Sequence, residues 1–106
     1  MIIVTSETIA NKRIVKTLGL VRGNTVRARH IGKDIMASFR NIVGGEVHEY
    51  AKLIAESREQ TIDRMVAEAE SLGANAILAT RFTTSVMMGG AAELLAVGTA
   101  VIVEDA

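Results

Sequence analysis

The sequence of 106 residues contains no cysteine, no proline and no tryptophan. Without cysteine it has neither a disulfide framework nor a thiolate metal site. Twelve basic and twelve acidic residues cancel, which argues against nucleic acid or an anionic membrane as the main partner. The apolar runs are far shorter than the roughly 18 to 20 residues of a membrane span, and no basic flank precedes the first of them. We therefore expect a cytoplasmic protein with no nucleic-acid or membrane partner.

The residues that are present are mostly small and aliphatic. Apolar residues make up 49% of the chain and aromatic residues only 3%. No stretch resembles a linker, so residues 1–106 are predicted to form a single domain. A chain of this size buries about two-thirds of its unfolded surface. Without large aromatic anchors it has difficulty covering both faces of a sheet, which is a first indication of contacts between copies.

Segments rich in β-branched and apolar residues predict strands at residues 2–4, 13–29, 76–86 and 93–103. Gly19 and Gly23 interrupt the second segment, so it is either one long bent strand or a hairpin. The segment Met87-Met88-Gly89-Gly90 predicts a turn between the last two strands. The last strand is apolar on both faces, which is typical of a strand buried on both sides.

Two helices are predicted between these strands. The first has apolar residues at three-to-four-residue spacing, at Ile31, Ile35, Phe39 and Ile42, and ends at Gly44-Gly45. The second is one long helix from Glu46 to Leu72, although Ser57 and Gln60 could instead form a capping box that starts a further helix. The expected fold is therefore α+β, with an antiparallel sheet covered on one face by the long helix and on the other by a second copy.

Several short strings, taken together, carry a family resemblance. They are Asn41-Ile42-Val43-Gly44-Gly45-Glu46, Tyr50, Arg58, Gly73-Ala74-Asn75-Ala76, Arg81, Met88-Gly89-Gly90-Ala91-Ala92-Glu93 and Gly98-Thr99-Ala100-Val101. In this order and spacing they resemble the YbjQ-like family of small prokaryotic proteins, which often carry a heavy-metal-binding label. The resemblance implies a dodecin-like α+β fold and assembly as a ring-shaped homopentamer. It implies no particular activity, because none is established for the family.

Arg81 and Glu93 are the candidate site residues that stand out most. They lie in otherwise apolar strands on either side of one turn, where charges are costly unless they are paired. A hairpin centred on Gly89-Gly90 would place Arg81 near Gly98. The two charges either form a structural ion pair, within the chain or between copies, or bind a small anionic ligand at a subunit boundary. Glu46, after a glycine pair at a helix start, either lies beside such an anion or caps the helix itself.

Metal ligands are few. His30 and His48 are separated by a helix and lack ligand spacing, so we interpret them as solvated or capping residues. Met87 and Met88 offer two thioethers that could converge on a ring axis, but neighbouring strand residues point to opposite faces, which favours packing roles. No phosphate loop, dinucleotide fingerprint or nucleophile elbow is present, so no cofactor is expected.

We therefore expect an oligomeric binding protein that holds a small ligand or ion between subunits, rather than an enzyme. One alternative is a heavy-metal-binding protein, as the family label suggests. Another is a hydrolase or isomerase that uses Glu93 or Glu46 as a base and Arg81 as its electrostatic partner.

Overall fold

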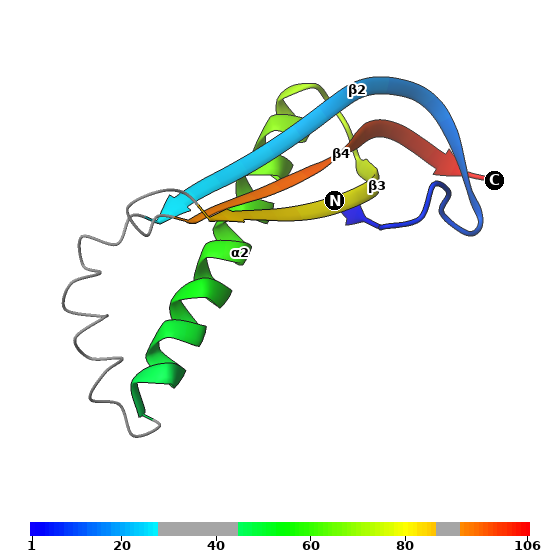
Figure 1. Ribbon diagram of the computed structural model, residues 1–106. Helices are drawn as coiled ribbons and strands as arrows, with labels where there is room; N and C mark the ends of the chain where they lie inside the picture. Colours follow the sequence, from blue (N-terminus) through cyan, green and yellow to red (C-terminus); the bar gives the residue numbers. More distant parts are fainter. Residues whose placement is uncertain (28–44, 87–91) are drawn as a thin grey trace.

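The computed structural model describes residues 1–27, 45–86 and 92–106 (Figure 1). The predicted helix at 31–42 and the predicted turn at 87–90 lie outside these residues. Within them, no helix has the length and apolar character needed to cross a membrane.

The described strands form one four-stranded sheet in the order β1-β3-β4-β2. Their bounds are Ile2–Ile3 for β1, Lys12–Arg27 for β2, Ala76–Val86 for β3 and Ala92–Asp105 for β4. β4 is antiparallel to both neighbours, whereas β1 pairs parallel with β3. The prediction of a purely antiparallel sheet was therefore wrong, and the sheet is mixed. More than seventy residues separate β1 from β3, so no tight turn forces these two strands to run antiparallel.

β2 is one long strand and not a hairpin, and its two glycines have different roles. Gly19 has a φ of 119° and lies at a shift in the register between β2 and β4, which is the bulge expected from a glycine inside a strand. Gly23 instead faces the helix. A Cβ atom at Gly23 would lie 2.3 Å from the carbonyl oxygen of Thr61 and 2.4 Å from the backbone nitrogen of Met65. Glycine at this position therefore lets the helix approach the strand.

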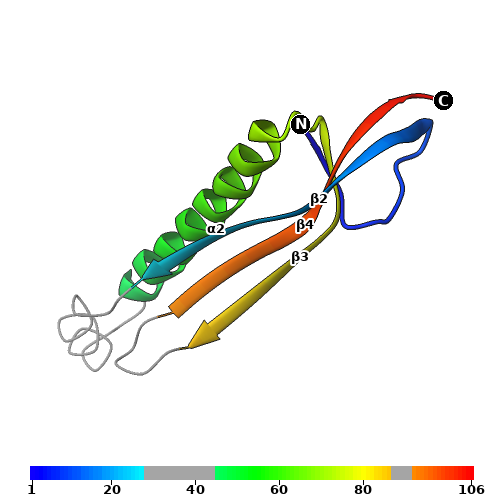
Figure 2. The ribbon, with the colours of Figure 1, turned by 90° about the horizontal axis from the view of Figure 1, so that it is seen from above.

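Among the described residues there is one helix, α2, which spans Gly45–Ser71. Figure 2 shows α2 running alongside β2, with β3 on the far side of the sheet. Two polar residues in the middle of the helix, Ser57 and Thr61, are buried and face the sheet. The Thr61 Oγ1 atom lies 2.9 Å from Thr25 Oγ1, and Arg27 Nε donates to Ser57 Oγ at 2.7 Å. Ser57 therefore bonds to β2 from within the helix and does not start a second one.

Two small hydrophobic cores lie on opposite faces of the sheet, because neighbouring residues of a strand point to opposite sides. The first core lies beneath α2 and contains Val21, Met65, Ala69, Ile77, Ala96 and Ala100. The second contains Ala76, Leu78, Val101 and Val103, with Val4 and Ile9 packed against it. The N-terminal segment therefore covers one end of the face that α2 leaves open.

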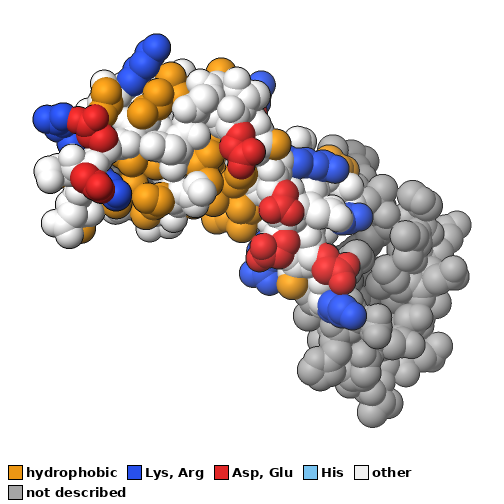
Figure 3. All heavy atoms as spheres, turned by 180° about the vertical axis from the view of Figure 1, so that it is seen from behind, with side chains coloured by type: hydrophobic (Ala, Val, Ile, Leu, Met, Phe, Trp, Pro, Cys, Tyr) orange, Lys and Arg blue, Asp and Glu red, His pale blue; other side chains and the backbone are white. Residues whose placement is uncertain are grey.

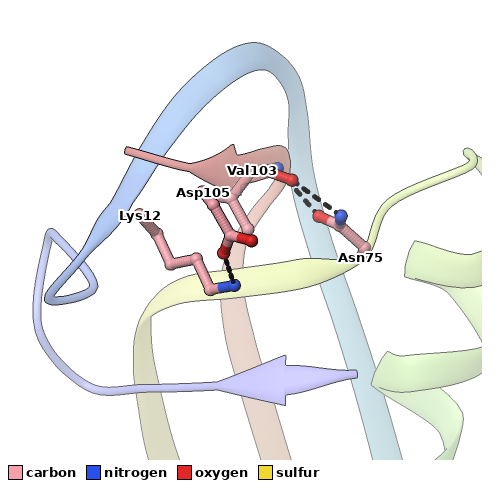
Figure 4. Close-up of polar contacts among 4 residues, drawn as sticks. All are labelled: Lys12, Asn75, Val103 and Asp105. Carbon is pink, nitrogen blue, oxygen red and sulfur yellow. Dashed lines mark hydrogen bonds and ion pairs between the residues drawn. The ribbon is translucent and has the colours of Figure 1, made fainter.

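Asn75 extends the β3–β4 ladder beyond β3 (Figure 4). Its side-chain Nδ2 donates to the carbonyl of Val103 at 2.9 Å, and its Oδ1 accepts from the N–H of Val103 at 2.8 Å. The side-chain amide thus acts as a peptide group would. Nearby, Lys12 and Asp105 are partners across β2 and β4 and form an ion pair. This ion pair joins the ends of β2 and β4, the two longest of the described strands.

Candidate functional site

Arg81 lies on the sheet face opposite α2 and is exposed. Its NH1 atom donates to the carbonyl oxygens of Thr5 at 2.8 Å and Thr80 at 2.9 Å. Arg81 therefore ties the N-terminal segment to β3. Arg81 was predicted to lie near Gly98, and it pairs with the neighbouring residue, Val97.

A bulge precedes Arg81 in β3. The β3–β4 register changes between Leu78 and Arg81, and Ala79 has a φ of 52°, a conformation that costs an alanine about 1 kcal/mol. The space above Gly98 is filled from β3 instead: a Cβ at Gly98 would lie 2.5 Å from Ile77 Cγ2 and 3.3 Å from Thr80 Oγ1. That buried Thr80 hydroxyl has no hydrogen-bond partner among the described residues.

Glu93 lies on the same face as Arg81 but farther along the sheet. It is half-buried, pairs with Ser85 of β3, and accepts a hydrogen bond from Asn24 Nδ2 at 3.3 Å. Arg81 lies opposite Val97, four residues from Glu93, which corresponds to about 13 Å along β4. The described part of one chain therefore does not form an Arg81–Glu93 ion pair.

The other candidate residues are not brought together by the described part of the chain. Glu46 and His48 lie at the start of α2, and their side chains are outside the description. His30, Met87 and Met88 lie outside the described residues altogether. Within the described ranges, no group of three or more histidine, aspartate and glutamate side chains could hold a metal ion.

An open groove of about 490 Å³ lies between α2 and the second half of β3, and sequence analysis did not find it. Its lining residues are Ala55, Arg58, Glu59 and Ile62 of the helix with Phe82 and Thr84 of the strand. Phe82 is one of only two phenylalanines in the chain. Its side chain is 51% exposed, whereas phenylalanine side chains are usually buried. Phe82 and Arg81 are neighbours in β3 and therefore face opposite sides of the sheet.

This groove combines an aromatic ring with one cation and one anion at its rim. Such a mixture of apolar floor and few polar groups is typical of small-molecule sites. It is shallow in a single chain, because α2 packs mainly against β2 and only slightly against β3. A second, smaller groove of about 280 Å³ lies on the other face, beside the bulge. Its lining includes Glu7, Ile14, Thr17 and Ala79.

The fold defines a class of small α+β proteins in which one long helix covers part of a mixed four-stranded sheet. Comparisons give the particular family: the chain belongs to the YbjQ-like family, whose model matches residues 1–104 and carries the description "Putative heavy-metal-binding". The resemblance noted in the sequence is therefore confirmed.

Similar proteins share the uncharacterised family name UPF0145. One from Methanosarcina acetivorans is 57% identical over 101 residues, which is 95% of both chains. One from Dehalococcoides mccartyi is 56% identical over 98% of this chain and 100% of its own. A crystal structure of a DUF74 protein of unknown function from Pediococcus pentosaceus matches with a TM-score of 0.65 over 98% of both chains. At 14% identity, that structure supports the fold alone.

Proposed function

We propose that this protein is a homo-oligomeric binding protein of the cytoplasm, built as a ring that holds a small ligand or ion between subunits. The observation that carries the proposal is the amount of surface that one chain leaves exposed. A compact monomer of 11.3 kDa has an accessible surface of roughly 5,700 Å². This chain exposes 7025 Å².

The excess of about 1,300 Å² is comparable to the surface that a subunit loses in association. A standard interface buries about 800 Å² on each partner, and a ring subunit has two of them. The radius of gyration leads to the same conclusion: it is 17.4 Å, against about 13 Å for a compact domain of this length.

The nature of the exposed surface also supports association. Large apolar side chains are exposed on both faces of the sheet. Leu20 at 65% and Val26 at 52% lie on the face opposite α2, and Phe82 at 51% and Val86 at 85% lie on the α2 face. A monomer rarely exposes apolar side chains as clusters. Figure 3 shows apolar side chains gathered over the sheet between groups of charged residues. Half-buried Leu95 and Val97 of β4 add to the face that α2 does not cover.

The ligand site of this proposal lies in the groove between α2 and β3, which a neighbouring subunit would deepen. Arg58 and Glu59 could bind the charged groups of a small molecule, and Phe82 could stack on a flat apolar part. Arg81 and Glu93 remain ligand candidates only through contacts between copies, because one chain keeps them apart. This separation also removes the main support for an enzyme that uses both.

Native mass spectrometry of the purified protein tests the proposal. We expect a single species of five chains, the copy number implied by the family resemblance, and release of a small molecule when protein from the native host is denatured. A monomer of 11.3 kDa at micromolar concentration would contradict the ring. An oligomer that releases nothing would contradict the ligand part alone.

The second candidate function is metal binding, which the description of the family model favours. Met87, Met88, His30 and His48 are the residues to test, as soft or borderline ligands for copper, zinc or nickel. Calorimetric titration with each metal decides between the two candidates. Binding tighter than that of an albumin control, and lost on replacement of both methionines by leucine, would support a metal site.

A further inference from the structure

The smaller groove, on the face of the sheet opposite α2, is formed by separate segments of one chain. β2 and β4 bend there, and the N-terminal segment runs beneath them (Figure 1). The lining residues include Ile14 and Thr17 of β2, Leu78 and Ala79 of β3, Thr99 of β4 and Glu7 of the N-terminal segment. Its volume of about 280 Å³ equals that of about nine water molecules. A molecule of roughly ten non-hydrogen atoms therefore fits it.

The bulge in β3 determines that Arg81 lies on the same face as this groove. Leu78 pairs with Thr99 and Arg81 pairs with Val97, so two residues of β3 lie opposite one residue of β4. Without the extra residue, Arg81 would pair with Ala96, which lies in the core beneath α2, because a shift of one residue reverses the two faces of a strand. The bulge therefore turns a cation toward the groove.

The bulge has a strained backbone that the N-terminal segment holds in place. Ala79 has a φ of 52°, and its N–H donates to the carbonyl oxygen of Ser6 at 2.9 Å. The N–H of Thr80 donates to the carbonyl oxygen of Val4 at 3.0 Å. Bulges and strained residues are concentrated at functional sites, where they direct a side chain. The side chain that this bulge directs is that of Arg81.

The guanidinium of Arg81 is fixed in position but keeps its charge and most of its donors. Its NH1 atom donates to the carbonyl oxygens of Thr5 and Thr80. Thr5 lies two residues before Glu7, and Thr80 follows Ala79, so the guanidinium lies beside the groove. The two bonds use the hydrogens of NH1 and leave Nε and NH2, a pair of donors that matches a carboxylate.

Glu7 supplies the opposite charge at the same groove. The ion pairs found among the described residues join β2 to β4, and neither of them includes Glu7 or Arg81. These two side chains therefore do not neutralise each other, although both belong to one region of the chain. An apolar floor with one cation and one anion complements a small molecule that carries both charges and an apolar part.

We propose that the groove beside the bulge binds a small aliphatic amino acid as its zwitterion. The carboxylate bonds to Nε and NH2 of Arg81, and the ammonium group bonds to Glu7. The aliphatic side chain packs against Ile14 and Leu78. This site goes beyond the proposed function, because all of its residues belong to one chain. Arg81 would need a second copy to meet Glu93, but it needs none to act with Glu7.

NMR titration of the isotope-labelled protein with L-leucine tests the inference. The backbone amides of Ala79 and Thr99 should shift and saturate together. Arg81→Met should weaken binding at least tenfold, because methionine keeps the aliphatic stem but not the charge or the donors. Arg22→Met is the matched control. Arg22 is also exposed and pairs with Val97 from the other side, but it does not line the groove, so the affinity should be unchanged.

Thr17→Phe tests the groove itself if Arg81→Met loosens the N-terminal segment. The larger side chain fills the groove and leaves Arg81 and Glu7 in place. Because phenylalanine is favoured in strands, this variant should stay folded by circular dichroism and lose the binding of leucine.

Two analogues of leucine test the two charges. 4-Methylpentanoate lacks the ammonium group and 3-methylbutylamine lacks the carboxylate, so each should bind at least tenfold more weakly than leucine. Glu7→Gln should weaken the binding of leucine but not that of 4-methylpentanoate, because only leucine has an ammonium group for Glu7.

Several outcomes would overturn the inference. One is that leucine at millimolar concentration shifts neither amide, and another is that folded Arg81→Met or Thr17→Phe binds leucine as the wild type does. Equal binding of leucine and 4-methylpentanoate would also overturn it. A wild-type monomer that binds leucine would contradict the ring of the proposed function and leave this site intact, whereas an oligomer that does not bind leucine would do the reverse.

Discussion

The two edges of the sheet differ in how their backbone groups are satisfied. At β2, the side chains of Arg64 and Glu68 reach over the edge and bind the groups of Asn24 and Arg22. At β3, the backbone groups of Phe82, Thr84 and Val86 point away from β4, and they find no partner in the described part of the chain. One helix can close one edge. Its position therefore decides where the protein is free to associate.

The position of α2 depends on Gly23, so Gly23→Ala should have the largest effect on the difference between the two edges. The new Cβ would lie within 2.4 Å of two backbone atoms of the helix, which cannot move without displacing α2. We expect a loss of about 3 kcal/mol in the free energy of unfolding, measured by urea titration at fixed protein concentration.

Gly19→Ala is the matched control for this variant. Gly19 also has an unusual role, but a Cβ there would meet nothing within 4 Å. Only its φ of 119° opposes alanine, so the loss should be smaller, about 1 kcal/mol. Equal losses at the two glycines would show that close approach of the helix is not what Gly23 provides.

Arg64→Met tests the closure of the β2 edge directly. Methionine keeps much of the aliphatic stem but cannot donate to the Asn24 carbonyl, so we expect a loss of about 1 kcal/mol. The freed edge should also raise the rate of aggregation, which light scattering measures. Replacement of the exposed Lys52 on the same helix by methionine is the control. Aggregation at the same rate in both variants would argue against edge closure by Arg64.

Much of this arrangement could be read from the sequence, because strands and helices leave strong local patterns. The four strands and the long helical segment followed from β-branched runs, glycines and the absence of proline. The parallel pairing of β1 did not follow, since pairing between distant segments leaves no local signal. The bulge at Ala79 was also invisible, because alanine gives no indication of a positive φ.

The candidate site shows the same limit. Arg81 and Glu93 were selected as costly charges in apolar strands, but each has its own partners. Arg81 donates to the carbonyl groups of Thr5 and Thr80, and Glu93 accepts from Asn24. Ser57 was the alternative start of a second helix, and it instead makes buried contacts with Thr25 and Arg27 from within one helix. Sequence identifies residues that need a partner. Which partner each one finds depends on register, and register is set by long-range pairing.

Ala79→Gly tests the bulge that separates two parts of β3. The N-terminal segment pairs with the outer edge of the first part but not with that of the second. Ala79 has a φ of 52°, where glycine is free of the steric penalty that alanine suffers. Relief of that strain, partly offset by the greater freedom of glycine in the unfolded chain, should stabilise the protein by about 0.5 kcal/mol. Ala79→Val should destabilise it, because a β-branched residue is strained further there. A glycine variant less stable than the wild type would show that the bulge is not a strained feature.

The smallest expected effect lies at the far end of β2, where charges and not the helix protect the edge. A hydrogen bond and the positive charge of Lys12 lower the pKa of Asp105 from its ordinary value of 3.8. A lowered pKa in the folded state stabilises the protein above pH 3.8, and this contribution is lost as the pH falls through the folded-state value. Asp105→Asn should therefore lower the Tm slightly at neutral pH, and the difference should vanish in acid. Because the pair is exposed, added salt should reduce the difference as well. A difference that is independent of both pH and salt would show that Asp105 acts through packing and not through its charge.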